Sequence, residues 1–247
     1  MRIARVFVDR PLTAGETVTV DKATYHYLFN VLRLRSGASL RVFNGQGGEY
    51  SAQLLNLSKK TAQLQIEAFQ ATERESALTL TLIQAVCRPE HMDYALQKAV
   101  ELGVQQIIPL RTERSPPLDQ NRLAKRHQHW QQVIIQACEQ CGRNRLPQLH
   151  ALLSFAAGLA QTQQHQLKFM LAPQGQQRLS DFSAQRVPSI AVLIGAEGGL
   201  TEEEMQLAQQ LGYNDIHLGP RVLRTETASV AMLAICQALW GDVGLLF

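Results

Sequence analysis

Two glycine-bearing segments near the C-terminus constrain this chain more than any other feature. The first, Val192–Glu204, has the sequence VLIGAEGGLTEEE, and the second, Leu218–Thr227, has the sequence LGPRVLRTET. Each pattern predicts an apolar strand that runs into a tight loop and then opens a helix. Because glycine lets the main chain approach closely and adopt positive φ, two such loops close together favour a pocket in which backbone groups face a flat polar ligand.

A helix start follows the first loop. Thr201 is the predicted N-cap, Glu204 completes a capping box, and Leu200 and Met205 form a hydrophobic staple. An isolated loop of this kind is often an ordinary tight turn. The second loop repeats the arrangement, and the pair therefore favours cofactor binding.

The two loops and their spacing resemble the RsmE-type ribosomal RNA methyltransferases of the SPOUT superfamily. The resemblance extends to Gln97–Val104, to Cys138–Pro147 and, near the N-terminus, to His26–Leu34, in the family's order. These matches span nearly the whole chain, so agreement by chance at one glycine loop is a poor explanation for them.

The resemblance implies an α/β fold with two domains. Residues 73–247 are expected to form a SPOUT methyltransferase domain with a mainly parallel sheet and a trefoil knot, and residues 1–72 a PUA-like β-barrel for RNA recognition. A polar stretch at 70–76 marks the boundary. The resemblance also implies a homodimer with pockets near its interface.

Periodicity supports this division. Alternating apolar residues over 61–68 predict strands in the first part, with one helix near 23–33. After residue 78 strands and helices alternate, as in a parallel α/β sheet. The predicted strands are 78–86, 106–110, 167–171, 189–194 and 216–218, and the predicted helices include a long one around 123–141 and a last one at 226–240.

The activity that the resemblance implies is methyl transfer from S-adenosylmethionine to N3 of a uridine in small-subunit (16S) ribosomal RNA, within the assembled small subunit. The expected cofactor-binding residues are Leu171, Leu193, Gly195, Glu197, Gly198, Gly199, Leu218, Gly219, Arg221, Leu223, Arg224 and Thr225. The chemistry requires orientation of the methyl group, a water-poor pocket and an acidic group or carbonyls near the cation. It requires no metal.

Uridine N3 carries a proton that must leave, so a general base or a cation that stabilises the uridine anion would help. The candidates are Arg88, Arg143, Arg224 and Glu197. Glu197 at a helix start can instead satisfy backbone amides, and a structural salt bridge explains a given arginine more often than catalysis does.

Charge is unevenly distributed along the chain. Residues 1–72 hold 9 Lys and Arg against 5 Asp and Glu, whereas the remainder is nearly neutral. A basic accessory domain suits a polyanionic substrate, although a solvated surface gives the same count. The expected RNA-binding residues are Arg33, Arg35, Arg88, Arg114, Arg143 and Arg145. Lys59, Lys60, Arg122, Lys125 and Arg126 are further candidates for phosphate contacts.

The remaining features limit the alternatives. The pair Cys138 and Cys141 ends a long predicted helix and has no second pair, which argues against redox or zinc chemistry. No stretch approaches the roughly 20 apolar residues of a membrane span, and no signal peptide is evident. We therefore expect reduced cysteines, no metal, no membrane association and a cytoplasmic location.

Two departures from the family pattern stand out. Ala196 occupies a position where the family usually has proline, and His91 one where a basic residue is common. Three other functions remain open: a related SPOUT enzyme acting on another RNA, a nicotinamide dehydrogenase, and an RNA-binding module without the cofactor. This chain lacks the G-x-G-x-x-G pattern of a nicotinamide dehydrogenase. The glycines of both loops argue against an RNA-binding module that has lost the cofactor.

Overall fold

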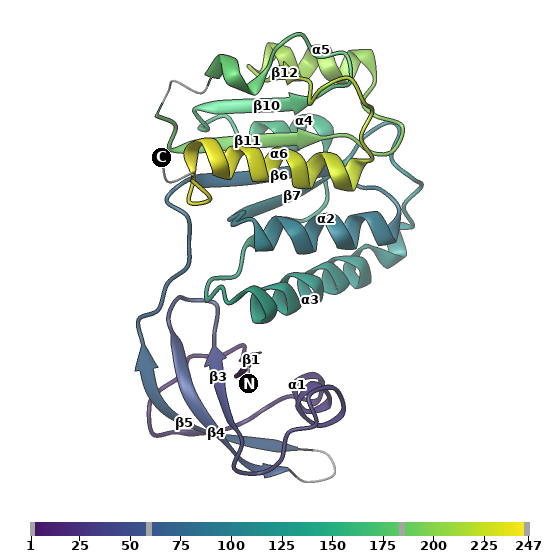
Figure 1. Cartoon of the computed structure of the whole chain (residues 1–247). Helices are drawn as coiled ribbons and strands as arrows, with labels where there is room; N and C mark the ends of the chain where they lie inside the picture. The colour runs from purple at the N-terminus through teal and green to yellow at the C-terminus, as the bar shows by residue number, and fades with distance from the viewer. Residues whose placement is uncertain (1–2, 58–60, 183–185, 245–247) are drawn as a thin grey trace. The chain divides into compact units, whose positions relative to one another are not determined.

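The computed structural model describes residues 3–57, 61–182 and 186–244 (Figure 1). The chain forms two units. The N-terminal unit comprises Met1–Glu75 and Cys138–Leu146, and the C-terminal unit comprises Ser76–Ala137 and Pro147–Phe247. The later segment belongs to the N-terminal unit through contacts such as that of Arg5 Nη2 with Asn144 Oδ1 at 2.7 Å. Linear sequence patterns did not reveal this return of the chain.

A five-stranded sheet in the order β1-β3-β4-β5-β2 forms the N-terminal unit. The strands are β1 (Ala4–Phe7), β2 (Thr17–Thr19), β3 (Ser39–Phe43), β4 (Glu49–Leu57) and β5 (Ala62–Gln70). The pair β1 and β3 is parallel, and the other neighbours are antiparallel. Alternate residues of β5, including Leu64 and Ile66, are fully buried, as the predicted period of two requires.

The predicted helix at 23–33 is shorter in the structure. It consists of α1 (Lys22–His26) and a π-helical turn, η1 (Tyr27–Val31). Arg33 follows in the left-handed region with φ 51°, the only such non-glycine residue among those described. Because L-residues rarely adopt this conformation, the chain leaves the helix at this point.

A seven-stranded sheet forms the centre of the C-terminal unit, in the order β12-β10-β11-β6-β7-β8, with β9 also paired to β7. Its strands are β6 (Thr79–Ala85), β7 (Gln106–Arg111), β8 (Gln148–Leu149), β9 (Leu153–Ser154), β10 (Leu167–Leu171), β11 (Ser189–Ile194) and β12 (Asn214–Ile216). All the pairings are parallel. The predicted α/β fold with a mainly parallel sheet is confirmed.

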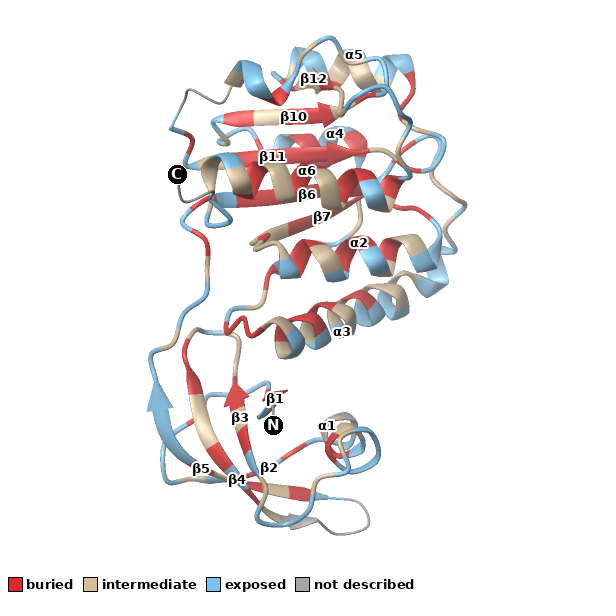
Figure 2. Ribbon diagram, viewed as in Figure 1, coloured by how far each residue is buried: buried red, intermediate tan, exposed pale blue. Residues whose placement is uncertain are grey.

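The central strands β6 and β11 are buried along nearly their whole length (Figure 2), which explains their continuous apolar sequences. The α-helices are α2 (Pro89–Glu101), α3 (Leu123–Cys141), α4 (Phe155–Ala160), α5 (Glu202–Gln210) and α6 (Thr225–Trp240). Helix α4 packs against β7, and α6 packs against β11. The short helices η2 (Gln120–Arg122) and η3 (Leu179–Phe182) complete the set. Helices α2 and α6 pack against each other, and α6 crosses in front of β11 in Figure 1.

Local signals set several of these boundaries. The predicted capping box of α5 is confirmed, because Glu204 N donates to Thr201 Oγ1 and Thr201 N donates to Glu204 Oε2. Gly103, at φ 77°, follows the end of α2, where a glycine in the left-handed region commonly ends a helix. Among the described residues, no helix is long and apolar enough to cross a membrane. The trefoil knot stays a prediction.

A half-buried carboxyl group in the N-terminal unit gives a test of the fold. Burial raises the pKa of Glu139 to about 7, although the Phe7 N–H donates to its carboxylate at 3.0 Å and Arg5 also favours the charged form. The folded pKa therefore lies above the unfolded one, so stability falls as pH rises from about 4.5 to about 7.

We expect Glu139→Gln to stabilise the protein at pH 8 by roughly 3 kcal/mol, because the amide keeps the acceptor for Phe7 without the partly desolvated charge. The gain should largely disappear at pH 5. Urea unfolding of both proteins at the two pH values measures it. An equal gain at both values would contradict the assignment.

Candidate functional site

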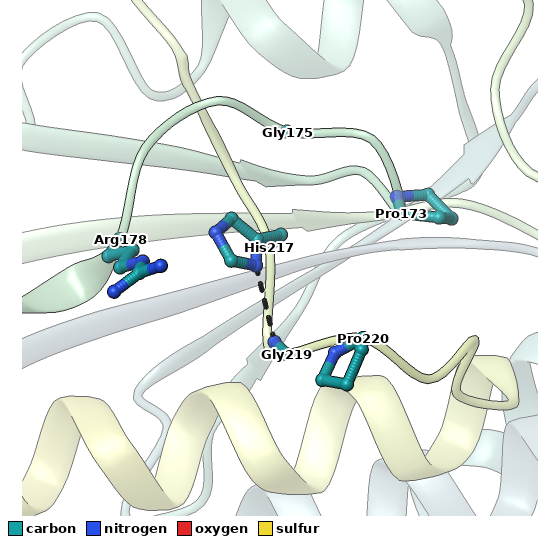
Figure 3. A pocket seen from close by; sticks show the side chains of 6 residues that line it. All are labelled: Pro173, Gly175, Arg178, His217, Gly219 and Pro220. Carbon is teal, nitrogen blue, oxygen red and sulfur yellow. Dashed lines mark hydrogen bonds between the residues drawn. The ribbon is translucent and has the colours of Figure 1, made fainter.

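A cavity of about 610 Å³ opens where β10 and β12 end (Figure 3). Two loops enclose it, one after β10 and one after β12. The lining residues of this first cavity are Pro173, Gly175, Arg178, His217, Gly219 and Pro220. Because ligands of open parallel sheets bind outside the carboxyl ends of the strands, this cavity lies where the fold favours a ligand.

Glycine is required in both of these loops, for two different reasons. A Cβ on Gly175 would lie 2.7 Å from the carbonyl carbon of Ile216, so only glycine lets the first loop pack against β12. Gly219 adopts φ 87° with open space around it, and a side chain there would strain the backbone. The Gly219 N–H donates to His217 Nδ1 at 3.3 Å (Figure 3).

The glycine loop, residues 195–199, follows β11. Its turn is closed by a hydrogen bond from Gly199 N to Ala196 O at 2.9 Å, and Gly199 has φ 72°. A Cβ on Gly195 would lie 3.0 Å from the carbonyl carbon of Gly199. The predicted tight loop between strand and helix is therefore present, and its two ends pack backbone against backbone.

A buried polar network fixes the glycine loop to α6. Thr225 Oγ1 donates to Gly195 O at 2.6 Å and accepts a hydrogen bond from Gln84 Nε2 at 3.1 Å. Ser229 Oγ in turn donates to Gln84 Oε1 at 2.6 Å. Since these groups are buried and mutually satisfied, they hold the loop in one position.

Arg114 supports the same loop from outside. Its Nη1 donates to Gly198 O at 2.8 Å and to Leu200 O at 3.1 Å. One carbonyl group of the loop and one directly after it thus share one guanidinium nitrogen. Arg114 was expected to contact RNA, and its contacts in this structure are with the glycine loop.

Glu197 lies at the centre of a polar cluster. Its Oε1 accepts hydrogen bonds from Arg88 N and from His91 Nδ1, both at 2.9 Å. Glu226 Oε2 lies 3.8 Å from the same His91 nitrogen, so the imidazole faces two carboxylates. Glu226 Oε2 is buried and has no hydrogen-bond partner in the described part of the chain.

The cluster sets the charge state of Glu197. Burial alone would raise its pKa, but hydrogen bonds from backbone N–H groups and from His91 outweigh burial and lower the pKa below its ordinary value. Glu197 is therefore ionised at neutral pH, and it accepts rather than donates hydrogen bonds.

The other expected cofactor residues lie in three places. Leu171 pairs with Ile216 at the end of β10, and Leu193 is fully buried in β11. Leu218 is half-buried beside Gly219. The residues that lead into α6 are Arg221 and Arg224, which are exposed, and Leu223, which is half-buried. Of the expected set, Gly219 lines the first cavity.

The remaining candidate arginines belong to the N-terminal unit. Arg33 and Arg35 are exposed, and Arg145 pairs with Glu73. Arg143 is 3% exposed, and its Nε donates to Glu75 Oε1 at 2.9 Å. Such burial and pairing explain Arg143 as a structural residue, so we do not carry its catalytic or RNA-binding role further. Lys59 and Lys60 lie outside the described residues.

Sequence reasoning missed several residues of the site: Pro173, Gly175, Arg178 and His217 of the first cavity, and Gln84, Ser229 and Glu226 around the glycine loop. A signal for the first group was present, because Pro173 and Gly175 follow a predicted strand as the other loops do. No sequence pattern marks a buried glutamine as the anchor of a distant loop.

Family comparisons match both parts of the chain. The family described as RNA methyltransferase domain matches residues 74–237, and the RNA methyltransferase PUA domain matches residues 20–67. A relative from Buchnera aphidicola subsp. Schizaphis graminum, the ribosomal RNA small subunit methyltransferase E, is 31% identical over 98% of both chains.

Two solved structures are similar over the whole chain. A methyltransferase from Legionella pneumophila in complex with SAM is 35% identical, with a TM-score of 0.94 over 98% of this chain and 100% of that one. The ribosomal RNA small subunit methyltransferase E of Neisseria gonorrhoeae, bound to S-adenosylmethionine, is 36% identical, with a TM-score of 0.89 and the same coverage.

Proposed function

Because this chain belongs to the ribosomal RNA small subunit methyltransferase E family, we propose that it methylates N3 of a uridine in 16S ribosomal RNA, using S-adenosylmethionine (SAM). The observation that carries the proposal is the arrangement of three strand-to-loop turns at the carboxyl ends of β10, β11 and β12. The predicted resemblance is confirmed by the family matches.

The residues present fit SAM. The first cavity, of about 610 Å³, has the size of a small-molecule site, and its glycines leave backbone groups open to a flat ligand. We assign Gly219 and Leu218 to one side of the cofactor, the loop at 173–175 to another, and the glycine loop to the reacting end. The other expected cofactor residues, Leu171, Leu193, Arg221, Leu223, Arg224 and Thr225, form or support these loops.

Bound SAM supplies a methyl group made electrophilic by the sulfonium. The chain's own residues must place the uridine, keep water out and accept the N3 proton. We assign this last task to the pair His91 and Glu197, whose imidazole and carboxylate are in contact at 2.9 Å. Arg88 and Arg224, both exposed beside these loops, are proposed to stabilise the uridine anion.

The N-terminal unit is proposed to bind the RNA, with residues 1–72 as its recognition domain. Arg33 and Arg35 are exposed at one end of η1, and the nearby Phe29 is 48% exposed and stacks on Tyr25 with ring centroids 5.6 Å apart. Exposed aromatic rings beside arginines suit unpaired bases and phosphates.

Charge reversal tests that surface. We expect Arg33→Glu with Arg35→Glu to weaken RNA binding by about 100-fold at low salt, because two phosphate contacts become repulsive. SAM affinity should stay unchanged. Filter binding and calorimetry measure the two quantities, and equal RNA affinity would remove the surface from the proposal.

We also propose a homodimer that works in the cytoplasm on the assembled small subunit. Support for the dimer comes from exposed apolar side chains on the packed helices α2 and α6: Tyr94 is 47% exposed and Leu239 41%. Val222, on the segment before α6, is 79% exposed. Apolar surface of this kind favours association.

The activity is tested by labelled methyl transfer from SAM to unmodified small subunits, with free ribosomal RNA and transfer RNA as parallel acceptors and nucleoside analysis of the products. N3-methyluridine from the subunit supports the proposal. Label only in transfer RNA would redirect it to another SPOUT activity. Calorimetry with SAM distinguishes an enzyme from a binding module that lacks the cofactor.

A further inference from the structure

A second cavity, of about 520 Å³, lies in the C-terminal unit between the start of α2 and the first turns of α3. It shares no lining residue with the first cavity. Its lining residues are Cys87, Pro89, Met92, Asp93, Arg122, Lys125, Arg126, His129 and Trp130.

The α3 side of this second cavity is basic. Arg122 pairs with Asp119 at 3.3 Å, and His129 Nε2 contacts Asp93 Oδ2 at 2.7 Å. Lys125 and Arg126, by contrast, have no carboxylate within ion-pairing distance among the residues described. Two unpaired cations on successive residues attract an anion such as a phosphate group.

The rest of the lining is apolar, with Trp130 of α3 facing residues at the start of α2. Trp130 is 3% exposed, Met92 and Cys87 are each 1% exposed, and Pro89 completes the surface. Burial raises the pKa of Cys87 to about 12, so its thiol is neutral and acts as an apolar group. A cationic rim over an apolar floor matches a nucleotide, which has a phosphate at one end and a flat base at the other.

Residues of the second cavity are sequence neighbours of a residue in the proposed reaction centre. Cys87 and Pro89 flank Arg88, whose N–H donates to Glu197 of the glycine loop. An RNA strand that places one base at Glu197 can therefore place the adjacent nucleotide at this cavity.

We propose that the second cavity receives a nucleotide of the substrate RNA adjacent to the one that is methylated. Lys125 and Arg126 hold its phosphate, and its base lies against Trp130 and Met92. This inference rests on the proposed function. It gives the RNA a second binding site, in the methyltransferase domain, besides the surface proposed on the N-terminal unit.

The first test is the double variant Lys125→Ala with Arg126→Ala. We expect KM for small subunits to rise about 30-fold, since two charge-assisted contacts are lost, with SAM affinity unchanged. The matched control, Lys98→Ala with Arg186→Ala, removes the same charge elsewhere in the unit. An unchanged KM, or an equal rise in the control, would overturn the proposal.

The second test observes the cavity directly. The chain has two tryptophans, so Trp240→Phe leaves Trp130 as the only one. We expect uridine 5′-monophosphate to quench Trp130 emission, uridine to do so more weakly, and the Lys125→Ala, Arg126→Ala change to abolish the response. Absence of quenching at millimolar nucleotide would overturn the subsite. Methyl transfer by the parent protein separates that failure from failure of the proposed function.

Discussion

Replacing Gly195 by valine should reduce SAM affinity by at least 100-fold, or about 2.7 kcal/mol at 25 °C. Its Cβ would lie 3.0 Å from Gly199 C and 3.2 Å from Leu200 N, and both of these are backbone atoms that cannot rotate away. The glycine loop would have to open, which would also disturb the hydrogen bond from Thr225 to Gly195 O. Isothermal titration calorimetry with SAM measures the loss.

Substitutions at two other glycines serve as controls for this result. A Cβ on Gly244 meets nothing within 4 Å, so Gly244→Val should bind SAM normally. A Cβ on Gly198 meets the flexible side chain of Arg114 at 3.1 Å, so Gly198→Val should cause a loss of intermediate size. Circular dichroism checks that each variant is folded. Normal SAM affinity in a folded Gly195→Val protein would reject the assignment of the glycine loop.

Elements with one dominant signal could be predicted from the sequence. The strand at 189–194 is a continuous apolar run, and its bounds agree with β11; the helix at 226–240 differs from α6 by one residue. The strand predicted at 216–218 was wrong, because β12 spans Asn214–Ile216. Its residues Asn214 and Asp215 are polar, and they are held in the strand by parallel pairing with β10, which no local pattern reveals.

The loops of the site were predictable for a similar reason. Glycine at a strand end is visible in sequence, whereas the groups that hold the loop come from distant parts of the chain. Gln84 reaches Thr225 across 141 positions, and Arg114 reaches Gly198 across 84. Arginine identity alone did not separate Arg114, on the loop, from the buried Arg143. Tertiary pairing decides which charge is structural.

Replacing Glu197 by glutamine should lower the single-turnover rate of methyl transfer by about 100-fold, equivalent to about 2.7 kcal/mol of transition-state stabilisation. The amide oxygen can still accept from Arg88 N–H, so the loop keeps its fold. What disappears is the negative charge beside His91, which is one half of the pair proposed to accept the N3 proton. Rapid-quench assays with small subunits measure the rate.

Charge, rather than the hydrogen bond alone, is the quantity under test. Glu197→Asp keeps the charge on a shorter side chain and should recover part of the rate. Glu202→Gln, an exposed change in the first turn of α5, should leave the rate unchanged. Because the pKa of Glu197 is lowered, its contribution should be complete at neutral pH and be lost only as acid protonates the carboxylate. A normal rate in Glu197→Gln at pH 7 would exclude Glu197 from proton removal and leave His91 to be tested with Glu226 alone.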